Sequence, residues 1–452
     1  MRCRKKAERM ETVAALVCTA IVLGAWTGVS ATVLRVPSEY PTIQAGIDAA
    51  VGGDTVLVAD GTYTGNGNRD IDFGGRAIVL LSEHGPQMTI IDCEGTDQDP
   101  HRGFYFHSNE VSTSVVQGFT IMSGWTYTGG AVLCHDSSPT ILNNIMTGNT
   151  AEGGGGIMCR ANSHAVIVGN TITENSVSLC GGGIYCHSGS PASIEDNLIT
   201  ENTAAYCGGG IRCNESSPAI TGNTLVGNTA AYGGGICALE SSFPTVLNSI
   251  LWGNSANIGE EVFDDGTSSV TVTYSDVEGG KEGEGNIDAD PLFVSGPLGG
   301  YYLSQIAAGQ AEESPCVDAG DAGSAVGEGT TRTDHVYDVW PVDMGYHYEE
   351  AGGAGGDDHR EVSHLTQNYP NPFAATTTIG YSLGRRTKIV LAIYDIQGAL
   401  VRELVDRTYP AGSHEITWDG RDGRGYYVAS GIYLCHMKAG EHAETKRMVL
   451  LR

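Results

Sequence analysis

One phrase recurs five times along the middle of the chain, with its asparagine positions at steps of 26 or 27 residues, and it limits the fold more than any other feature. Each copy contains short runs of alternating apolar residues and shows no helical period. A unit this short cannot bury its apolar side alone, so it must stack on its neighbours. The copies read GGAVLCHDSSPTILNNIMTGN (129–149), GGGIMCRANSHAVIVGNTITEN (154–175), GGGIYCHSGSPASIEDNLITEN (181–202), GGGIRCNESSPAITGNTLVGN (208–228) and GGGICALESSFPTVLNSILWGN (233–254).

The alternation within one copy predicts short strands joined by turns. Ile184 and Cys186 would point inward and Tyr185 outward, while Ile194 and Ile199 begin the second and third inward sets. Three such strands form one turn of a parallel β-helix, whose coils stack about 4.8 Å apart. Equivalent residues of successive copies then lie above one another. We therefore expect an all-β fold dominated by a parallel β-helix.

Two columns of asparagine follow from this stacking. The amides can bond up and down the stack, so we expect a structural ladder of inward side chains at the turns. The first column contains Asn144, Asn170, Asn197 and Asn223, with Ser249 in the fifth place, and the second contains Asn149, Asn175, Asn202, Asn228 and Asn254.

The cysteines fall into the same columns. One column contains Cys134, Cys159, Cys186 and Cys213, for which buried thiols and disulfides both remain open and thiols are favoured. Cys180 and Cys207 occupy a second column just before GGG. Neighbouring coils bring their Cα atoms within the span of a disulfide, which we expect there.

The flanks of the repeats extend the stack. YPTIQAGIDAA (40–50) has helical spacing and would cap the first coil, whose strand edges are otherwise unpaired. Residues 281–348 are irregular and are expected to close the far end. EEAGGAGGDDHREVS (349–363) is Gly-rich and polar, so it is interpreted as a linker.

The N-terminus indicates export. A basic start, an apolar run to Trp26 and small residues at 29–31 are typical of a signal peptide, here assigned to residues 1–31. No later segment is long and apolar enough to span a bilayer. We expect a protein that is secreted or lies on the outer surface of a bacterial cell.

The net negative charge of the chain limits the classes of molecule that it is expected to bind. The chain carries −28 formally, and removing residues 1–31, with five basic and two acidic side chains, takes it to −31. Nucleic acid is therefore excluded as an expected partner. The acidic surface leaves Ca²⁺ open, although no residue pattern supports a site, and no cofactor is expected.

The outward positions are where a ligand would bind. Tyr185 can stack on a sugar ring, and Arg212, His187 and Arg160 can bond hydroxyl or carboxylate groups. These four residues are the candidate substrate-binding set. The competing interpretation is an ordinary mixed surface.

Residues 33–348 resemble the secreted right-handed parallel β-helix proteins that share the pectate-lyase-type fold. The similarity lies in VPSEYPTIQAGIDAAVGGDTVLVADGTYTG, in SSPTILNNIMTGNTAEGGGG and in SPCVDAGD with VDMGYHY. Enzymes with this fold act on acidic polysaccharides, the lyases through clustered Asp and Ca²⁺ and the hydrolases through NTD, DD, GHG and RIK settings. The chain lacks NTD, GHG and RIK, and its DD pair, Asp264 and Asp265, has no such partners. No catalytic or metal-binding residue is therefore assigned.

Beyond the linker the pattern changes to six or seven short antiparallel strands, which predict a small Ig-like β-sandwich over 364–452. QNYPNPFAATTTIGYSL, IYDIQGALVREL and KRMVLLR resemble the C-terminal sorting domain of type IX secretion and the Ig-like domain of flagellar hook-capping proteins. The resemblance implies recognition by outer-membrane secretion machinery.

Two hypotheses for residues 32–348 follow. The first is a non-catalytic surface protein that is structural or binds an extracellular polysaccharide. The second is a polysaccharide lyase or glycoside hydrolase acting on an acidic polysaccharide.

Overall fold

The computed structural model describes residues 31–324, 329–336, 338 and 341–348, and beyond them 364–365, 368, 371, 373, 375–383, 387–395, 400–409, 412–439 and 442–450. The predicted linker and nearly all of the predicted signal peptide lie outside these residues. The chain divides into two compact units, residues 1–354 and 355–452. Among the described residues, no helix combines the length and the apolar character needed to cross a bilayer.

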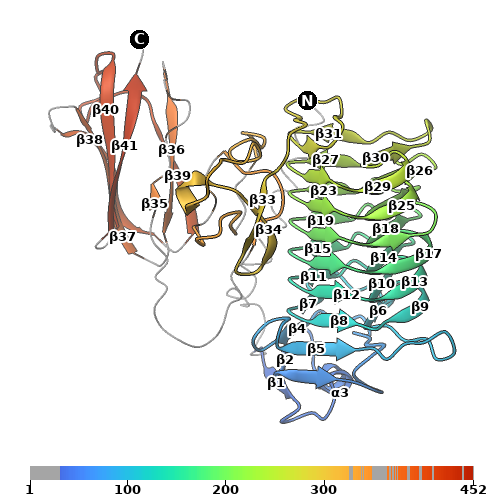
Figure 1. Ribbon diagram of the computed structural model, residues 1–452. Coiled ribbons are helices and arrows are strands. Elements are labelled where there is room, and N and C mark those ends of the chain that lie inside the picture. Colours follow the sequence, from blue (N-terminus) through green and yellow to red (C-terminus); the bar gives the residue numbers. More distant parts are fainter. Residues whose placement is uncertain are drawn as a thin grey trace. The chain divides into compact units, whose positions relative to one another are not determined.

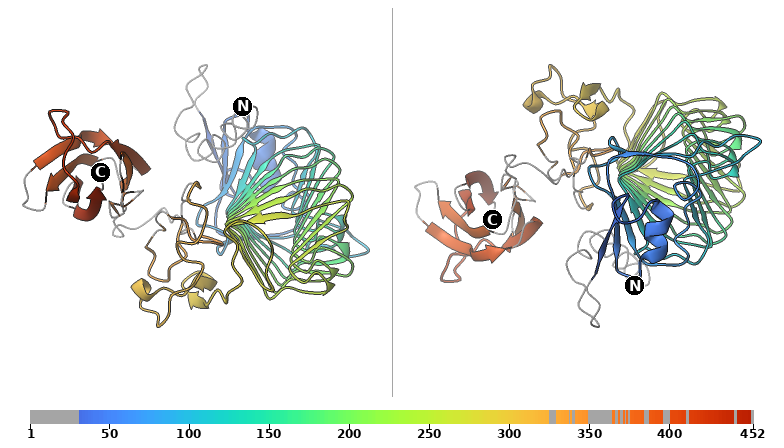
Figure 2. Two further views of the ribbon diagram at one scale, coloured as in Figure 1. Left: turned by 90° about the horizontal axis from the view of Figure 1, so that it is seen from above. Right: turned by 90° about the horizontal axis from the view of Figure 1, so that it is seen from below.

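The first unit is a parallel β-helix, as the repeats predict (Figure 1). Its strands form four parallel sheets, A to D, and successive coils superpose when viewed along the stack (Figure 2). Sheet A contains β1 (Val33–Val36), β2 (Thr55–Val58), β4 (Val79–Ser82), β7 (Val115–Gln117), β11 (Thr140–Leu142), β15 (Val166–Val168), β19 (Ser193–Glu195), β23 (Ala219–Thr221), β27 (Thr245–Leu247) and β31 (Thr271–Thr273). Sheet B contains β3 (Gly61–Tyr63), β5 (Thr89–Asp92), β8 (Thr120–Met122), β12 (Ile145–Thr147), β16 (Thr171–Thr173), β20 (Leu198–Thr200), β24 (Thr224–Val226), β28 (Ile250–Trp252) and β32 (Asp276–Val277).

The other two sheets begin higher in the stack. Sheet C contains β6 (Phe104–Phe106), β10 (Val132–His135), β14 (Ile157–Arg160), β18 (Ile184–His187), β22 (Ile211–Asn214), β26 (Ile236–Leu239) and β30 (Val262–Asp264). Sheet D contains β9 (Trp125–Thr128), β13 (Thr150–Gly153), β17 (Ser176–Cys180), β21 (Thr203–Ala204), β25 (Thr229–Tyr232) and β29 (Ser255–Ile258). A coil of the repeat region therefore has four strands, where the alternation predicts three. The additional strand follows the second asparagine column, and its inward residues are small.

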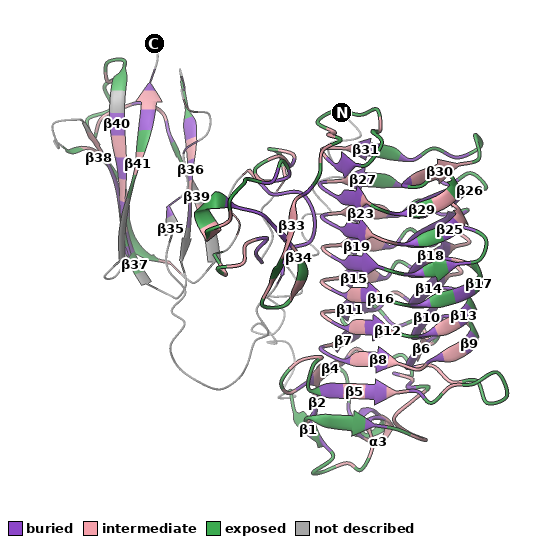
Figure 3. Ribbon diagram, viewed as in Figure 1, coloured by how far each residue is buried: buried purple, intermediate pink, exposed green. Residues whose placement is uncertain are grey.

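The strands of sheets A, B and C fill the core. Ile184, Ile194 and Ile199 are fully buried, and the equivalent positions in other coils are occupied by Ile, Val, Leu, Met or Phe. Burial is mapped on the ribbon in Figure 3, and in β19 and β23 of sheet A only the central residue, Ile194 or Ile220, is buried. Burial of this continuous apolar column supplies the main driving force for stacking.

The first asparagine column forms hydrogen bonds along the stack. The Oδ1 atom of Asn197 accepts from the backbone N–H (2.9 Å) and the Nδ2 (3.0 Å) of Asn170. Its own Nδ2 donates to the carbonyls of Ile167 (2.9 Å) and Glu195 (2.8 Å) and to Oδ1 of Asn223 (3.0 Å). Every hydrogen-bonding atom of this buried amide is thus used.

The column continues beyond the asparagines. Ser249, Ser275 and Asn286 accept the next backbone N–H groups in succession. The second column runs from Asn149 to Asn254 in the same way and ends on a carboxylate. Glu261 accepts from the backbone N–H (3.0 Å) and the Nδ2 (2.5 Å) of Asn254.

The N-terminal end is covered by a helix, as the spacing predicts. Helix α3 (Ile43–Ala49) has Thr42 as its N-cap, with the Thr42 hydroxyl accepting from the backbone N–H of Ala45. Ile43 and Ile47 are buried against the first coil. A Cβ atom on Gly46 would lie 2.9 Å from Val56 Cγ1, so the helix approaches the first sheet too closely for a larger residue.

The expectation that residues 281–348 close the far end holds only for the first few of them. The backbone N–H groups of Tyr274 and Val277, in the last coil, donate to the carbonyls of Glu284 (2.7 Å) and Ile287 (3.0 Å). Glu284 and Ile287 therefore lie against the end of the stack. The later described residues follow the outward face of sheet B and include β33 (Phe293–Gly296), β34 (Gly299–Leu303) and the short η1 (Ile306–Ala308). They cover the outward apolar side chains Leu198 and Ile250, which would otherwise meet water.

The second unit is an antiparallel β-sandwich, as predicted. One sheet contains β35 (His364–Leu365), β36 (Thr377–Leu383) and β39 (Gly412–Trp418). The other contains β38 (Leu400–Tyr409), β37 (Thr387–Asp395), β40 (Gly431–Ala439) and β41 (His442–Leu450). Trp418, Ile389 and Met448 are fully buried in a core separate from that of the β-helix.

Candidate functional site on the outward face of sheet C

Two columns of side chains point outward from sheet C, because alternate residues of each strand face away from the core. The four predicted binding residues all belong to these columns. The Tyr185 column contains Tyr105, Leu133, Met158, Tyr185, Arg212, Cys237 and Phe263 in strand register. The His187 column contains His135, Arg160, His187, Asn214 and Leu239.

The Tyr185 column points outward but is largely covered. At each corner between sheets D and C, a glycine with positive φ turns the chain back over the following strand. A Cβ on Gly181 (φ +73°) would lie 2.6 Å from Tyr185 Cβ, and one on Gly208 (φ +67°) would lie 2.9 Å from Arg212 Cβ. Arg212 is consequently only 4% exposed and Tyr185 is half-buried. Arg212 points outward, as predicted, but it is shielded from solvent because the glycine turn packs against it.

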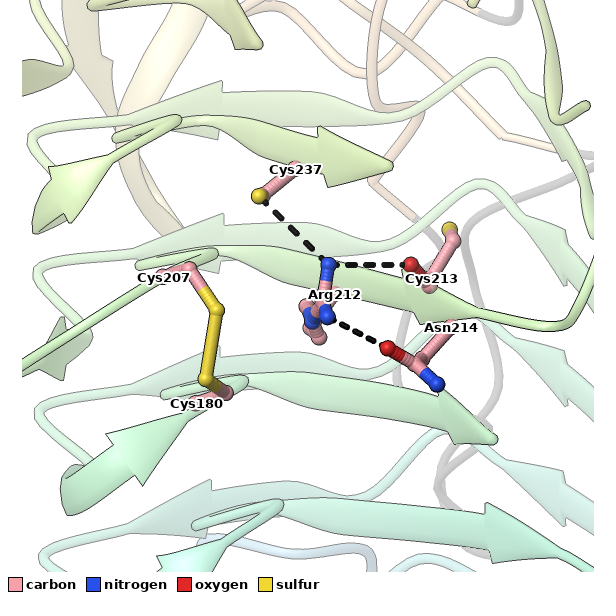
Figure 4. Close-up of a disulfide and its surroundings, with 6 residues drawn as sticks. All are labelled: Cys180, Cys207, Arg212, Cys213, Asn214 and Cys237. Atoms are coloured by element: carbon pink, nitrogen blue, oxygen red, sulfur yellow. Dashed lines mark hydrogen bonds between the residues drawn. A yellow bond between two sulfur atoms is a disulfide. The ribbon is translucent and has the colours of Figure 1, made fainter. Parts of the chain in front are cut away.

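The Arg212 guanidinium is held by neutral groups (Figure 4). Its Nη1 donates to the Cys213 carbonyl (3.2 Å) and to Cys237 Sγ (3.6 Å), and its Nη2 donates to Asn214 Oδ1 (2.5 Å). Its Cζ lies 5.9 Å from the centroid of the Tyr185 ring. Its Nε is buried without a hydrogen-bond partner, and no ion pair joins it to a carboxylate among the described residues. A buried cation without a counter-ion is costly, so this position favours an anion from outside the chain.

Two titratable neighbours of Arg212, Tyr185 and Cys237, are kept in their neutral forms by burial. Tyr185 and His187 are stacked, with ring centroids 5.4 Å apart. Burial raises the pKa of Tyr185, and the Arg212 guanidinium opposes that rise. Burial also raises the pKa of the Cys237 thiol to about 11, again against Arg212. Both groups therefore stay protonated near neutral pH.

Three residues of this site are not among the predicted set: Asn214, Cys237 and Glu240. Asn214 Nδ2 donates to Glu240 Oε2 (3.1 Å) and lies 3.5 Å from His187 Nδ1 in its own column, while its Oδ1 accepts from Arg212 and so links the two columns. Cys237 contacts Arg212 from the coil above. Glu240 could not be found from alternation, because it stands in the turn after β26, where the strand pattern has ended.

Arg160 lies two coils below Arg212 and beside another arginine. Arg102 donates from Nη1 to the Thr128 carbonyl (2.7 Å), and its Cζ lies 5.1 Å from the Tyr105 ring centroid. Burial lowers the pKa of Arg102, and the positive charge of Arg160 lowers it further. The Nε of Arg160 is buried without a hydrogen-bond partner. The face thus carries two positions at which cationic nitrogen atoms have no partner in the described chain.

These arginines stand out against the charge of their surroundings. Between residues 102 and 280 the chain has three Lys or Arg residues, Arg102, Arg160 and Arg212, and fifteen Asp or Glu residues. All three arginines lie at or beside sheet C. The strand pattern alone assigns Arg160 and Arg212 to this side, whereas Arg102 precedes β6 and is placed there by its contact with Tyr105.

The cysteine columns differ from one another. Cys180 and Cys207 form a disulfide with Cα atoms 4.7 Å apart, at the corner near Arg212 (Figure 4). Gly181, the residue after Cys180, packs against Tyr185. The column of Cys134, Cys159, Cys186 and Cys213 consists of buried free thiols in the core. These thiols form a straight column, and no three His, Cys, Asp or Glu side chains of the described chain are grouped so as to hold a metal ion.

The Asp264–Asp265 pair stabilises a turn. Asp265 accepts from the backbone N–H groups of Glu240 (3.1 Å), Thr267 (3.0 Å) and Ser268 (2.9 Å), and these bonds hold its pKa well below the usual range. Asp264 lies 4.0 Å from Lys281 Nζ. An Asp ionised so firmly by backbone donors is poorly suited to donate a proton in hydrolysis.

The chain resembles two known families in separate segments. The profile described as "Periplasmic copper-binding protein (NosD)" matches residues 47–233, and that described as "FlgD Ig-like domain" matches residues 374–442. No curated protein matches the chain significantly. The donor set of the described chain does not fit copper, since its thiols are aligned in the core and its histidines are not grouped with them.

Three solved structures show similarity to parts of the chain. The PL6 family alginate lyase AlyGC is 14% identical over 61% of this chain and 56% of its own, with a TM-score of 0.29. PorZ, a surface component of the type-IX secretion system of Porphyromonas gingivalis, is 21% identical over 24% of this chain and 14% of its own, with a TM-score of 0.16. Dimeric latent PorU from the same organism is 22% identical over 24% of this chain and 10% of its own, with a TM-score of 0.18. The chain thus spans about half of the alginate lyase and a small part of the other two.

Proposed function

We propose that the β-helix is a non-catalytic binding protein for an extracellular polysaccharide that carries carboxylates, and that the ligand lies along sheet C. The observation that carries the proposal is the guanidinium of Arg212. It is 4% exposed, its Nε has no partner, and no described carboxylate forms an ion pair with it. A carboxylate matches the planar guanidinium in geometry and charge.

The spacing of the arginines supports a linear ligand. Arg160 and Arg212 belong to β14 and β22, which are separated by β18 in the same sheet. Two coil steps correspond to about 10 Å along the stack. A polymer that runs parallel to the stack passes the partly exposed Arg160 and the ring faces of Tyr185 and His187. One of its carboxylates must enter the covered position of Arg212 to meet that guanidinium.

The net charge of the β-helix indicates that an anionic ligand is attracted by individual arginines and not by the protein as a whole. Residues 32–348 carry 38 acidic and eight basic side chains, so the β-helix as a whole repels a polyanion. At physiological ionic strength this repulsion is screened beyond about 8 Å, while contacts with a buried guanidinium are screened far less. Binding should therefore depend on the arginines of sheet C and tolerate moderate salt.

The state of the titratable groups favours binding over turnover. A lyase needs a base near the sugar carbon, and the half-buried Tyr185 has a raised pKa that keeps it protonated. Asp265 is ionised and committed to its turn. Neither group is poised for general acid–base chemistry at neutral pH.

The test uses the mature full-length chain and defined glycans. Calorimetric titration with oligomers of a polyuronate should show saturable binding, and a neutral glucan of the same length should bind at least tenfold more weakly. In parallel, the release of unsaturated uronate products is followed by absorbance. Equal affinity for both glycans would contradict the proposal. Turnover that is abolished by Arg212→Ala would establish the lyase alternative instead.

We propose further that residues 364–452 direct the protein to the outer surface of the cell through the type IX secretion machinery. The support is the resemblance of NYPNPF and the following strands to sorting domains, together with the Ig-like match over residues 374–442. The proposal concerns the second unit alone and is independent of the ligand.

A further inference from the structure

The disulfide connects two particular coils of the stack. In the corner column between sheets D and C, the positions equivalent to Cys180 and Cys207 are occupied in other coils by Thr128, Gly153, Tyr232 and Ile258. The cysteines therefore occur together in the coil of Tyr185 and the coil of Arg212. These are the same coils whose side chains form the cation–π contact of the candidate site.

Each cysteine lies directly before the glycine that backs one of these side chains. Gly181 follows Cys180 and packs against Tyr185, and Gly208 follows Cys207 and packs against Arg212. The backbone N–H of Gly181 donates to the Cys207 carbonyl at 2.9 Å, so the two corners are in direct contact. A covalent bond at this point fixes the surfaces against which both side chains rest.

The strand of sheet D that leads to Cys207 is the shortest strand of that sheet. Strand β21 has two residues, whereas the neighbouring β17 and β25 have five and four. Its register with β25 is limited to Thr203 opposite Thr229, and the pairing of β13 with β17 contains a register shift. Backbone hydrogen bonds still cross the corner, from the N–H groups of Ala205 and Tyr206 to the carbonyls of Val177 and Leu179, so the disulfide adds a covalent link to a ladder that continues past β21.

We infer that Cys180 and Cys207 are positioning residues for the ligand site, because their disulfide holds the Tyr185 and Arg212 coils in register beside the shortest strand of sheet D. The effect of the disulfide on ligand affinity rests on the proposed function. Its effect on the order of residues 181–187 and 208–214 rests on geometry alone. Without the bond, the corners separate and the ring of Tyr185 no longer stays beside the guanidinium. The stack itself persists through its core and its asparagine columns.

The test compares two variants of the mature chain. Cys180→Ser/Cys207→Ser removes the bond, and Asn223→Ala weakens the same coil at the opposite corner, between sheets A and B. The serine variant should bind a uronate oligomer about tenfold more weakly, and its amides at 181–187 and 208–214 should exchange faster without ligand. The Asn223→Ala chain should unfold at a lower temperature and keep its affinity within about twofold. Wild-type affinity in the serine variant would overturn the inference.

Amide exchange separates this inference from the proposed function. If the wild type binds no uronate, the proposed function fails, while unchanged exchange at 181–187 and 208–214 in the serine variant refutes the positioning role by itself. If the serine variant does not fold, the folded wild type is treated with a dithiol, which transfers two electrons and two protons to the bond and is itself oxidised. The same two readouts then apply.

Discussion

At the scale of single residues, Glu261 ends the second asparagine column with a carboxylate in place of an amide. Burial raises the pKa of Glu261 to about 7, and the two bonds from Asn254 do not offset that effect. A folded-state pKa above the unfolded value means that the stabilising contribution is complete below about pH 4.5 and is lost as the pH rises through 7. The β-helix should therefore be less stable at pH 8 than at pH 5.

Glu261→Gln tests this account of the column end. The amide oxygen of Gln can accept both bonds from Asn254, as the asparagines do elsewhere, without a buried charge. We expect the variant to be more stable than wild type at pH 8 by on the order of 1–3 kcal/mol, and nearly equal at pH 5. Chemical unfolding at both pH values measures this, with the exposed Glu260→Gln as control. An equal gain at both pH values would contradict the titration argument.

The interior of the first column should be far less tolerant. Asn197→Ala removes a fully bonded amide and leaves the N–H of Asn170 and the carbonyl of Ile167 without partners, so we expect a loss of about 2–4 kcal/mol in unfolding free energy. Asn197→Ser should lose roughly half as much, because Ser249 already accepts a ladder bond from Asn223. Equal losses in both variants would mean that the ladder contributes by packing alone.

At the scale of elements, the outward face of sheet C carries a charge that the fold does not need. Arg212 shares its column with the buried apolar side chains Leu133 and Met158. Replacing a buried charge without a counter-ion by an apolar residue of similar size is commonly neutral or stabilising. A residue that lowers the stability of the fold is commonly one that serves binding or activity.

Arg212→Met should therefore separate stability from binding. We expect its unfolding free energy to match or exceed that of wild type by up to about 3 kcal/mol, while affinity for a uronate oligomer falls at least tenfold. Arg160→Met serves as the partly exposed counterpart, with a stability change within about 0.5 kcal/mol. A clear destabilisation by Arg212→Met would indicate that the guanidinium serves the fold.

The sequence predicts the features that follow from the fixed repeat. It does not predict the strands of sheet D or the burial of Arg212, which depend on how the chain turns between sheets. Stacking, inward apolar residues and both asparagine columns follow from register, which the fixed period determines. The strands of sheet D were not predicted, because TAEG and TAAY contribute only small inward residues such as Ala151 and Ala230. The burial of Arg212 depends on how the glycine turn folds back over the strand, and alternation carries no information about that angle.

At the scale of the whole molecule, the two units have separate cores and opposite charge balance. Residues 32–348 carry an excess of 30 acidic side chains, whereas residues 364–452 carry eleven basic and eight acidic ones. The segment 293–348 belongs to the β-helix, since it covers Leu198 and Ile250 of sheet B. Removing the second unit should thus leave the first intact.

Deleting residues 366–452 tests this division and the sorting proposal together. We expect the β-helix to keep its far-UV circular dichroism and its melting temperature, and to accumulate in the periplasm. Cell fractionation and surface labelling of the producing bacterium measure the location. Unchanged delivery to the surface would refute the sorting role, and loss of the folded β-helix would refute the independence of the units.

Hydrogen exchange with and without a uronate oligomer tests most directly whether the ligand lies on the outward face of sheet C. We expect the mature chain to show slower exchange on binding at 157–160, 184–187 and 211–214, the strands of sheet C that carry Arg160, Tyr185 and Arg212, with sheet A unchanged. Protection confined to sheet A or sheet B, or no protection at saturating ligand, would contradict the assignment of the binding face.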